Sequence, residues 1–476
     1  MFVLLKKLMG DSFVYGLTSI LSRFIGFLLL PLYTRILTPA DYGVLNIVNT
    51  TVFLLTMFVV LALDSASGVF FWDKEYEKNE HPIFASWFWC QLTTAAFFAA
   101  LLAFLAPVLS EALFKTRNHA YIFRIAALIL PVSVIPTMIW NWFRLHRRVW
   151  STTIFVSIST LLQIGLTVYF IAYTRVGTVG FFWAQVIANG LMSLIGVFYI
   201  GKIILPKYFN KELLKKMLRF SLPMIPAALA FWLLNSANSY FLQVFKGEKE
   251  VGLYQIALNI ASIMSIVISS FTQAWGPFAF SIKENEGSNN FYANVFLLYT
   301  VLTTVMACLL GLFSTDLLKL ITTPAYYDAA FTAGLLAFNT ILGGLNYIAA
   351  LGLNFVKNMK PYSMAIIGGG IVNALLMFML IPYTGKEGAA VIMLVCNIGI
   401  TSFIFYQSQK RFFIPYAFRK AILFFGLGLG LYIIVRLVKL DSYLLKLGIS
   451  VFLLLMATFT LRSELKSLFI IKKLAK

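Results

Sequence analysis

Fourteen apolar stretches of about 20 residues each follow one another along the chain, and they constrain its fold more than any other feature. A helix of roughly 20 apolar residues crosses the hydrocarbon core of a bilayer and satisfies its own backbone hydrogen bonds there. Only 12% of the residues are charged, whereas soluble proteins carry roughly a quarter. The sequence therefore predicts an all-α integral membrane protein. The expected spans are 12–36, 43–66, 83–106, 120–142, 150–174, 178–201, 220–245, 251–276, 291–314, 329–355, 362–383, 388–408, 416–437 and 443–462.

Lysine and arginine show which loops face the cytoplasm, because they are about twice as frequent in one set of alternate loops as in the other. The richer set includes the longest loop, 202–219, which we expect to be an amphipathic linker helix at the membrane surface. Both termini are then cytoplasmic. The same distribution explains the net charge of +20 without nucleic acid as a partner. Lys6 and Lys7 precede a full apolar helix without a cleavage site, so the first helix is expected to be retained.

An internal repeat with an offset of 209 residues relates the first and second spans to the seventh and eighth. Asp41-Tyr42-Gly43 aligns with Glu250-Val251-Gly252, and a charged loop follows at the same distance in both halves. Six spans per unit is an even number, so the two units have the same orientation in the membrane, as parallel repeats do. We therefore expect two pseudo-symmetric six-helix lobes and two C-terminal helices. The predicted divisions are an N-lobe at 1–201, a linker at 202–219, a C-lobe at 220–408 and C-terminal helices with a tail at 409–476.

Arg23 lies inside the first predicted span, where an isolated charge costs several kcal/mol unless it faces protein or water. Its guanidinium could bind phosphate oxygens, or it could be a structural group satisfied by a neighbouring helix. Acidic residues show the opposite pattern, because only Asp64 falls within a span and it lies near the cytoplasmic end. A cation-coupled exporter usually needs a deeper carboxylate. The role of Asp64 itself stays open.

Uncharged amide side chains recur at helical spacing on four predicted spans. Buried amides in a bilayer bond to one another across helices or bind a polar ligand, and the sequence leaves both readings open for each residue. Stripes on paired repeat helices together favour a shared hydrophilic cavity. The candidate cavity residues besides Arg23 are Asn46, Asn49, Asn235, Asn238, Gln255, Asn259, Gln273, Asn339 and Asn346.

Arg144, Arg147 and Arg148 share one predicted cytoplasmic loop, where they act as a topology signal and could also gather anionic head groups. The three cysteines lie within apolar runs, and the three histidines are scattered over loops, where we expect them to be solvated. A P-loop motif is absent from the sequence, which argues against ATP hydrolysis through a P-loop. We therefore expect no catalytic residue, no metal site and no cofactor.

Three segments resemble bacterial polysaccharide transporters, the lipid-linked oligosaccharide flippases of the multidrug/oligosaccharidyl-lipid/polysaccharide (MOP) superfamily. These segments are SRFIGFLLLPLYTRILTPADYGVLN at 22–46, FSLPMIP at 220–226 and VGLYQIALNIASIMSIVISSFTQAWGPFAF at 251–280. The resemblance implies that an undecaprenyl-diphosphate-linked sugar repeat moves from the cytoplasmic to the periplasmic leaflet of the bacterial inner membrane. It implies alternating access between two lobes, Arg23 in the central cavity, and a groove for the lipid tail between the last two spans. Glycan polymerases and glycosyltransferases of the same pathway are possible partners.

The lipid II flippase branch shares the pattern of Ser22, Arg23, Gly26 and Phe27. Members of that branch carry further arginines where this sequence has Leu29 and the run 63–65, which favours an O-antigen, capsule or exopolysaccharide unit over a peptidoglycan precursor. A cation-coupled multidrug exporter of the same superfamily is the main alternative. A lipid II flippase and a membrane glycan polymerase or ligase are further ones, although a polymerase usually presents a longer periplasmic loop than any here. The sequence does not identify the sugar, the energy source or the oligomeric state.

Overall fold

The computed structural model describes residues 29–73, 79–438 and 442–474. These residues form helices, and no strand occurs among them. Twelve helices of the described ranges are long and apolar enough to cross a membrane. One of them, α18 (Lys360–Gln409), contains two of the predicted spans, joined where Gly385 takes a φ of 62°. The all-α, multi-pass fold predicted from hydropathy is thus confirmed, while most of the first predicted span lies outside the described residues.

The chain divides into two compact units, one ending at Gly252 and the other beginning at Leu253. In the first unit, α5 packs on α6, and α9 packs on α6, α7 and α8. This unit includes α11 and α12, which pack on α3. Its helices are α2 (Leu30–Ile36), α3 (Pro39–Val60), α4 (Leu63–Phe71), α5 (His81–Phe114), α6 (Ala120–Val132), α7 (Val134–Leu145), α8 (Val149–Val168), η1 (Tyr169–Tyr173), α9 (Thr178–Ile200), η2 (Pro206–Tyr208), α10 (Lys211–Ser221), η3 (Leu222–Met224), α11 (Ile225–Asn235) and α12 (Asn238–Lys246).

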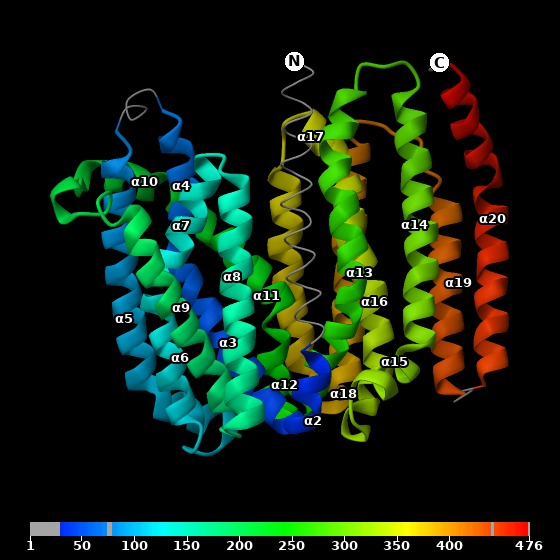
Figure 1. Cartoon of the computed structure of the whole chain (residues 1–476). Helices are drawn as coiled ribbons and strands as arrows, with labels where there is room; N and C mark the ends of the chain where they lie inside the picture. The colour runs from blue at the N-terminus through cyan, green and yellow to red at the C-terminus, as the bar shows by residue number, and fades with distance from the viewer. Residues whose placement is uncertain (1–28, 74–78, 439–441, 475–476) are drawn as a thin grey trace. The chain divides into compact units, whose positions relative to one another are not determined.

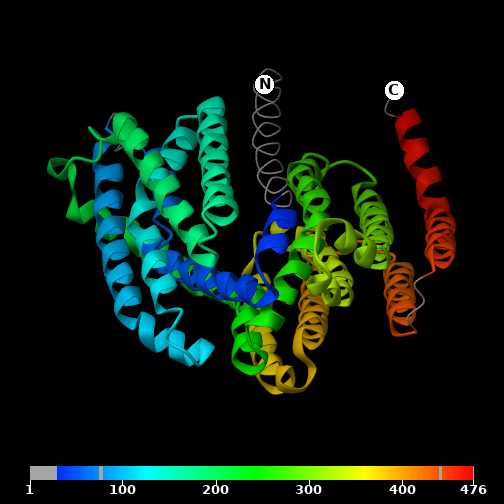
Figure 2. The ribbon, with the colours of Figure 1, turned by 60° about the horizontal axis from the view of Figure 1, so that its bottom comes forward.

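In the second unit, α14 packs against α16, α19 and α20, and α16 packs against α18 (Figures 1 and 2). The helix α13 (Glu248–Ser281) begins in the first unit and continues into the second. The remaining helices are α14 (Ser288–Leu312), α15 (Ser314–Ile321), η4 (Pro324–Ala329), α16 (Ala330–Ala349), α17 (Leu351–Phe355), α18, α19 (Phe418–Leu437) and α20 (Tyr443–Leu474). The lobe boundary predicted at the 202–219 linker stays a prediction.

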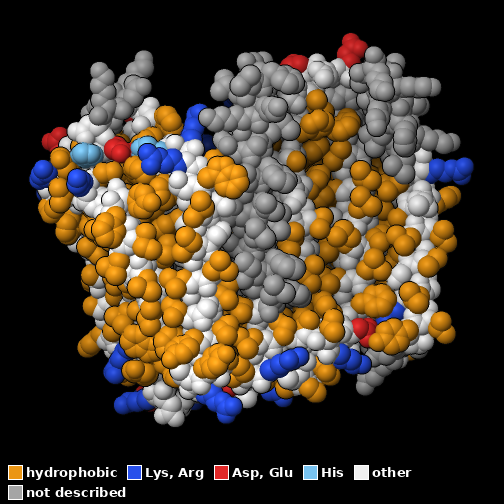
Figure 3. Space-filling model, viewed as in Figure 1, with side chains coloured by type: hydrophobic (Ala, Val, Ile, Leu, Met, Phe, Trp, Pro, Cys, Tyr) orange, Lys and Arg blue, Asp and Glu red, His pale blue; other side chains and the backbone are white. Residues whose placement is uncertain are grey.

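Apolar side chains cover the flanks of the helices, and charged side chains gather at the helix ends (Figure 3). Phe104 and Phe198, for example, are 81% and 90% exposed. A soluble protein rarely exposes large contiguous apolar patches, but hydrocarbon chains solvate such a surface well. The exposed aromatic and aliphatic side chains along the spans are therefore the lipid-facing surface of a membrane protein.

The run Thr38-Pro39-Ala40-Asp41 predicts a sharp turn from its sequence, and in the structure it begins α3 with a capping box. The Asp41 backbone N–H donates to Thr38 Oγ1 at 3.2 Å, and the Thr38 backbone N–H donates to Asp41 Oδ2 at 3.0 Å. This arrangement satisfies two of the backbone donors that a helix start leaves unpaired. The turn fixes where α3 starts and therefore where Gly43 lies.

Gly43 and Gly252, which the predicted repeat aligns, lie at a reciprocal close crossing of α3 and the first turn of α13. A Cβ atom added to Gly43 would collide with the carbonyl oxygen of Glu248, and one added to Gly252 would collide with that of Pro39. Each helix therefore brings its glycine against the backbone of the other, as small residues allow in membrane helix packing. Such a reciprocal contact is what a two-fold relation between these helices predicts.

Candidate functional site

The predicted cavity residues occupy several helices, and the structure brings only some of them together. Arg23, the predicted cationic group, lies outside the described residues. On α3, Asn46 is half-buried and Asn49 is exposed. On α11, Asn235 Nδ2 donates within its own helix to the Phe231 carbonyl oxygen at 2.9 Å. Asn238, at the start of α12, is fully buried.

Two predicted residues of α13 form a pair, because Gln255 Nε2 donates to Asn259 Oδ1 at 3.3 Å. Both are half-buried, while Gln273, four turns further along the same helix, is exposed. The spacing of four residues places Gln255 and Asn259 on one face, as the sequence pattern predicted. The pair therefore places two amide side chains on one face of α13.

Asn339 and Asn346 of α16 bond to residues of α18 that the sequence analysis did not select. Asn397 Nδ2 donates to Asn339 Oδ1 at 2.9 Å, and Thr401 Oγ1 donates to Asn346 Oδ1 at 2.8 Å. All four side chains are buried. The sequence left two interpretations open for Asn339 and Asn346, a hydrogen bond between helices or ligand binding. In the structure both residues form hydrogen bonds between helices. The four-residue spacing of Asn397 and Thr401 in the sequence could have indicated that both lie on one face of α18.

The arginines of the predicted head-group cluster lie at the end of α7, and each guanidinium lies over a tryptophan ring of α7 or of the residue that follows α4. The distance from the guanidinium carbon to the ring centroid is 4.7 Å for Arg144 over Trp140, 5.4 Å for Arg147 over Trp72 and 5.0 Å for Arg148 over Trp142. All three arginines are exposed. Stacking on aromatic rings holds guanidinium groups in place while leaving their N–H donors accessible. The cluster is therefore a fixed cationic surface.

His146 corrects the expectation that every histidine is a solvated loop residue. Its Nε2 lies 3.1 Å from Glu80 Oε2, and Trp142 Nε1 donates to Glu80 Oε1 at 3.2 Å. Burial is the largest influence and by itself would lower the pKa of His146, but the hydrogen bonds with Glu80 and the Trp142 carbonyl oxygen and the charge of Glu80 together outweigh it and raise the pKa above its usual value. Burial is also the largest influence on Glu80 and would raise its pKa, but the hydrogen bonds with His146 and Trp142 and the nearby histidine charges together leave the pKa of Glu80 lowered. Because Glu80 and His146 are far apart in the sequence, no local sequence pattern indicates that they form a pair.

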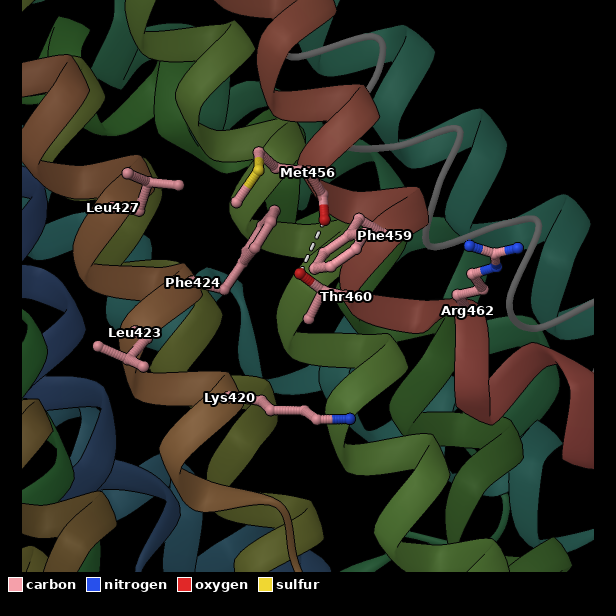
Figure 4. Close-up of a pocket in the computed structure, with 8 residues that line it drawn as sticks. All are labelled: Lys420, Leu423, Phe424, Leu427, Met456, Phe459, Thr460 and Arg462. Carbon is pink, nitrogen blue, oxygen red and sulfur yellow. Dashed lines mark hydrogen bonds between the residues drawn. The ribbon is translucent and has the colours of Figure 1, made fainter.

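A groove of about 770 Å³ opens between α19 and α20 (Figure 4). Both helices pack more closely against α14 than against each other, which leaves the space between them open. Most of the lining is apolar, and two cationic residues, Lys420 and Arg462, belong to the same end because the helices are antiparallel. The full lining is Lys420, Leu423, Phe424, Leu427, Met456, Phe459, Thr460 and Arg462.

The opposite end of the α19–α20 hairpin is fastened to α14 and α15. The Arg436 guanidinium donates to Thr315 Oγ1, Ser314 Oγ and the Gly311 carbonyl oxygen, each at 2.6 Å. Lys446 Nζ lies 2.8 Å from Asp316 Oδ2. These contacts hold the turn end of the hairpin against α14 and α15, while the groove lies nearer the Lys420 end. A mostly apolar lining with two cationic residues suits a lipid chain that carries an anionic head group.

Solved transporter structures share this fold. The chain superimposes on the lipid II flippase MurJ, in its inward closed conformation, with a TM-score of 0.72 and 14% identity, over 95% of this chain and 100% of that one. An inward-facing multidrug resistance MATE family transporter of the MOP superfamily matches with a TM-score of 0.64 and 15% identity, over 81% of this chain and 93% of that one. The fold is thus that of the MOP transporters.

Residues 8–283 match the model of a family described as polysaccharide biosynthesis protein. Because the match spans more than half of the 476 residues, the chain belongs to that family. A curated relative, the succinoglycan biosynthesis transport protein ExoT of Rhizobium meliloti (strain 1021), is 25% identical over 256 residues. The aligned part covers 51% of this chain and 48% of the relative, so the chain spans about half the length of the relative that it matches.

Proposed function

We propose that this protein is a flippase that moves an undecaprenyl-diphosphate-linked oligosaccharide repeat unit from the cytoplasmic to the periplasmic leaflet. The observation that carries the proposal is the apolar groove between α19 and α20, in a chain of the polysaccharide biosynthesis family. A groove of this kind holds a polyprenyl tail at the lipid boundary while the head group moves. Its position agrees with the groove implied by the family resemblance.

Physical chemistry requires a sheltered path for the head group. Unpaired polar groups cost several kcal/mol each in hydrocarbon, so a glycan with a diphosphate does not cross the bilayer unaided. We propose that two lobes alternate around a cationic polar cavity in which Arg23 binds the diphosphate and amides bind the sugars. The exposed amides Asn49 and Gln273 and the Gln255–Asn259 pair fit such a role better than the buried Asn339 and Asn346.

Arg144, Arg147 and Arg148 fit the first encounter with the substrate. Phosphate binds well to guanidinium groups that are already oriented, and tryptophan rings orient all three here. In the proposed topology this loop and both termini are cytoplasmic, so the cluster meets the lipid-linked unit on the side where it is made. Reporter fusions to the two termini test that topology, and a periplasmic signal from either terminus contradicts it.

The groove is tested by filling it in a host that needs this gene for surface glycan. Leu427→Trp places a large ring in the groove, whereas Ile422→Trp adds the same ring to an exposed position of α19 outside the lining. We expect the first variant to lose glycan output at a normal protein level and the second to keep it. Equal output from both variants removes the groove from the mechanism.

The head-group site is tested in the same host with Arg23→Ala and Arg23→Lys. Loss of glycan with the first variant and partial recovery with the second supports phosphate binding by this residue. Full output from Arg23→Ala at a normal protein level removes it from the proposed role. A cation-coupled exporter instead predicts drug resistance on expression and cation-dependent efflux from vesicles, and either result without glycan transport overturns the flippase proposal.

A further inference from the structure

The helix α10 presents a row of three cations on the side opposite its buried face. Leu213 and Met217 are buried where α10 packs on α4 and α5. Lys211, Lys215 and Arg219 follow one another at intervals of four residues and are all exposed. Four-residue spacing places side chains on one helix face, so this basic stripe is about 12 Å long.

The stripe is held in a fixed position by the segment that precedes it. Ser86 Oγ of α5 accepts a hydrogen bond from the Asn210 N–H at 2.9 Å and donates to the Asn210 carbonyl oxygen at 3.2 Å. Asn210 also caps α10, because its side chain accepts from the Leu213 N–H at 3.0 Å. Trp89 Nε1 donates to the Ile204 carbonyl oxygen at 3.0 Å. Both ends of the 204–210 segment are therefore attached to α5.

The stripe lies where membrane spans leave the hydrocarbon. The helix α10 continues through η3 into α11, and Lys211–Asn235 has the length and hydropathy of a span. Its attachment points, Ser86 and Trp89, belong to the first turns of α5, another span. In Figure 1, α10 lies at the same end of the first unit as α4, and Figure 3 shows lysine and arginine side chains at that end. This position is the level of lipid head groups.

Charge and apolar side chains at this position fit an anionic lipid surface. The segment 202–219 contains six lysines and arginines and a single acid, Glu212. Like charges at four-residue spacing repel one another and destabilise an isolated helix. Anions bound beside the stripe reduce this repulsion among its three cations. Phe209, Phe220 and Leu222 next to the stripe are exposed. Basic residues beside exposed apolar ones are typical of helices that lie in the interface.

We propose that the Lys211–Lys215–Arg219 stripe binds the phosphates of anionic phospholipids and fixes the linker between the proposed lobes to the bilayer surface. The stripe shares no residue with the groove or with the proposed cavity residues, and it does not depend on the identity of the transported molecule. Anionic lipid then stabilises one position of α10, which also begins the α11 span. We therefore expect the protein to retain anionic lipid when no substrate is being transported.

The test measures the ratio of phosphatidylglycerol to phosphatidylcholine that stays bound to the purified full-length protein from nanodiscs containing both lipids, by native mass spectrometry. The variant is Lys211→Gln/Lys215→Gln/Arg219→Gln. The matched control, Lys115→Gln/Lys246→Gln/Lys249→Gln, removes three exposed cations near the other end of α5. Lys211→Arg/Lys215→Arg/Arg219→Lys keeps the charge. Circular dichroism verifies that each variant is folded.

Each basic residue near an anionic surface contributes about 1 kcal/mol, a factor of about 5. We therefore expect the preference for phosphatidylglycerol to fall about 100-fold in the stripe variant at low salt, and less at high salt because screening already weakens it. The control and the charge-keeping variant should retain the wild-type preference. An unchanged preference in the stripe variant, or an equal fall in the control, overturns the proposal and leaves the stripe to a soluble acidic partner.

Discussion

Among the described residues, one ion pair in each unit joins the ends of two different helices, and the two pairs differ in burial and in the cation. Glu80, just before α5, pairs with His146, just after α7, at 3.1 Å, with side chains 22% and 25% exposed. Asp316 of α15 pairs with Lys446 in the first turn of α20 at 2.8 Å, with side chains 19% and 2% exposed. The second pair depends on a cation that is almost entirely inside the protein.

The difference between the pairs determines at which helix ends the stability of the contact depends on pH near neutrality. Burial by itself raises the pKa of Asp316, but its hydrogen bonds with Lys446 and Tyr443 outweigh burial and leave the pKa lowered. Its contribution is present above the ordinary pKa of about 4 and is lost only as the pH falls through the lowered value. The raised pKa of His146 works the other way, because its contribution is full below about pH 6.5 and is lost as the pH rises through the folded value.

The largest effect is expected from Asp316→Ala, because it leaves Lys446 buried without its carboxylate. Breaking one partner of a buried pair costs about 3 to 5 kcal/mol. Reversible unfolding in mixed micelles should show a loss of that size. The double variant Asp316→Ala/Lys446→Met, which replaces the pair by apolar groups, should recover most of it. A single variant as stable as the wild type would show that water reaches Lys446 and that the two pairs are alike.

The sequence predicted the spans well, because hydropathy over 20 residues depends little on partners that are distant in the chain. The long helices α5, α9 and α14 lie close to the predicted ranges 83–106, 178–201 and 291–314. Local chemistry also predicted the turn before α3, where Thr38 and Asp41 bond to each other's backbone. In each case the information lies within a short segment.

The sequence did not predict which side chains contact one another across helices. Glu80 is far from His146 in the chain, and Asn339 is far from Asn397. The sequence positions of these residues do not indicate which side chains contact one another. The candidate site is therefore predictable as polar faces on helices and not as a set of bonds. The repeat aligned Gly43 with Gly252, but the structure alone places each glycine against the backbone of the other's helix.

A smaller effect is expected from Glu80→Gln, which should remove the pH dependence of the first pair. A partly exposed ion pair such as this one contributes about 1 kcal/mol or less. The wild type should lose that amount of stability as the pH rises from 6 to 9, since His146 then loses its charge. The lowered pKa of Glu80 keeps the carboxylate charged throughout this range. Thermal unfolding in detergent at a series of pH values measures the difference between the two proteins.

Asp316→Ala is the control for that series, because the pair it breaks does not titrate in the same range. It should lower the stability at every pH and keep the wild-type slope. A Glu80→Gln protein with the wild-type slope would mean that His146 does not gain its proton affinity from Glu80.

The smallest effect is expected from Tyr443→Phe, which removes one hydrogen bond from the buried pair and leaves the ion contact intact. The Tyr443 hydroxyl donates to Asp316 Oδ1 at 2.9 Å, but the tyrosine is exposed and water can replace it. A single hydrogen bond contributes about 0.5 to 1.5 kcal/mol, and we expect the lower end of that range in mixed-micelle unfolding. In the Asp316→Ala background the same substitution should change nothing further, since the acceptor is gone. A loss in that background as large as in the wild type would mean that Tyr443 acts through the packing of its ring and that Asp316 depends on Lys446 alone.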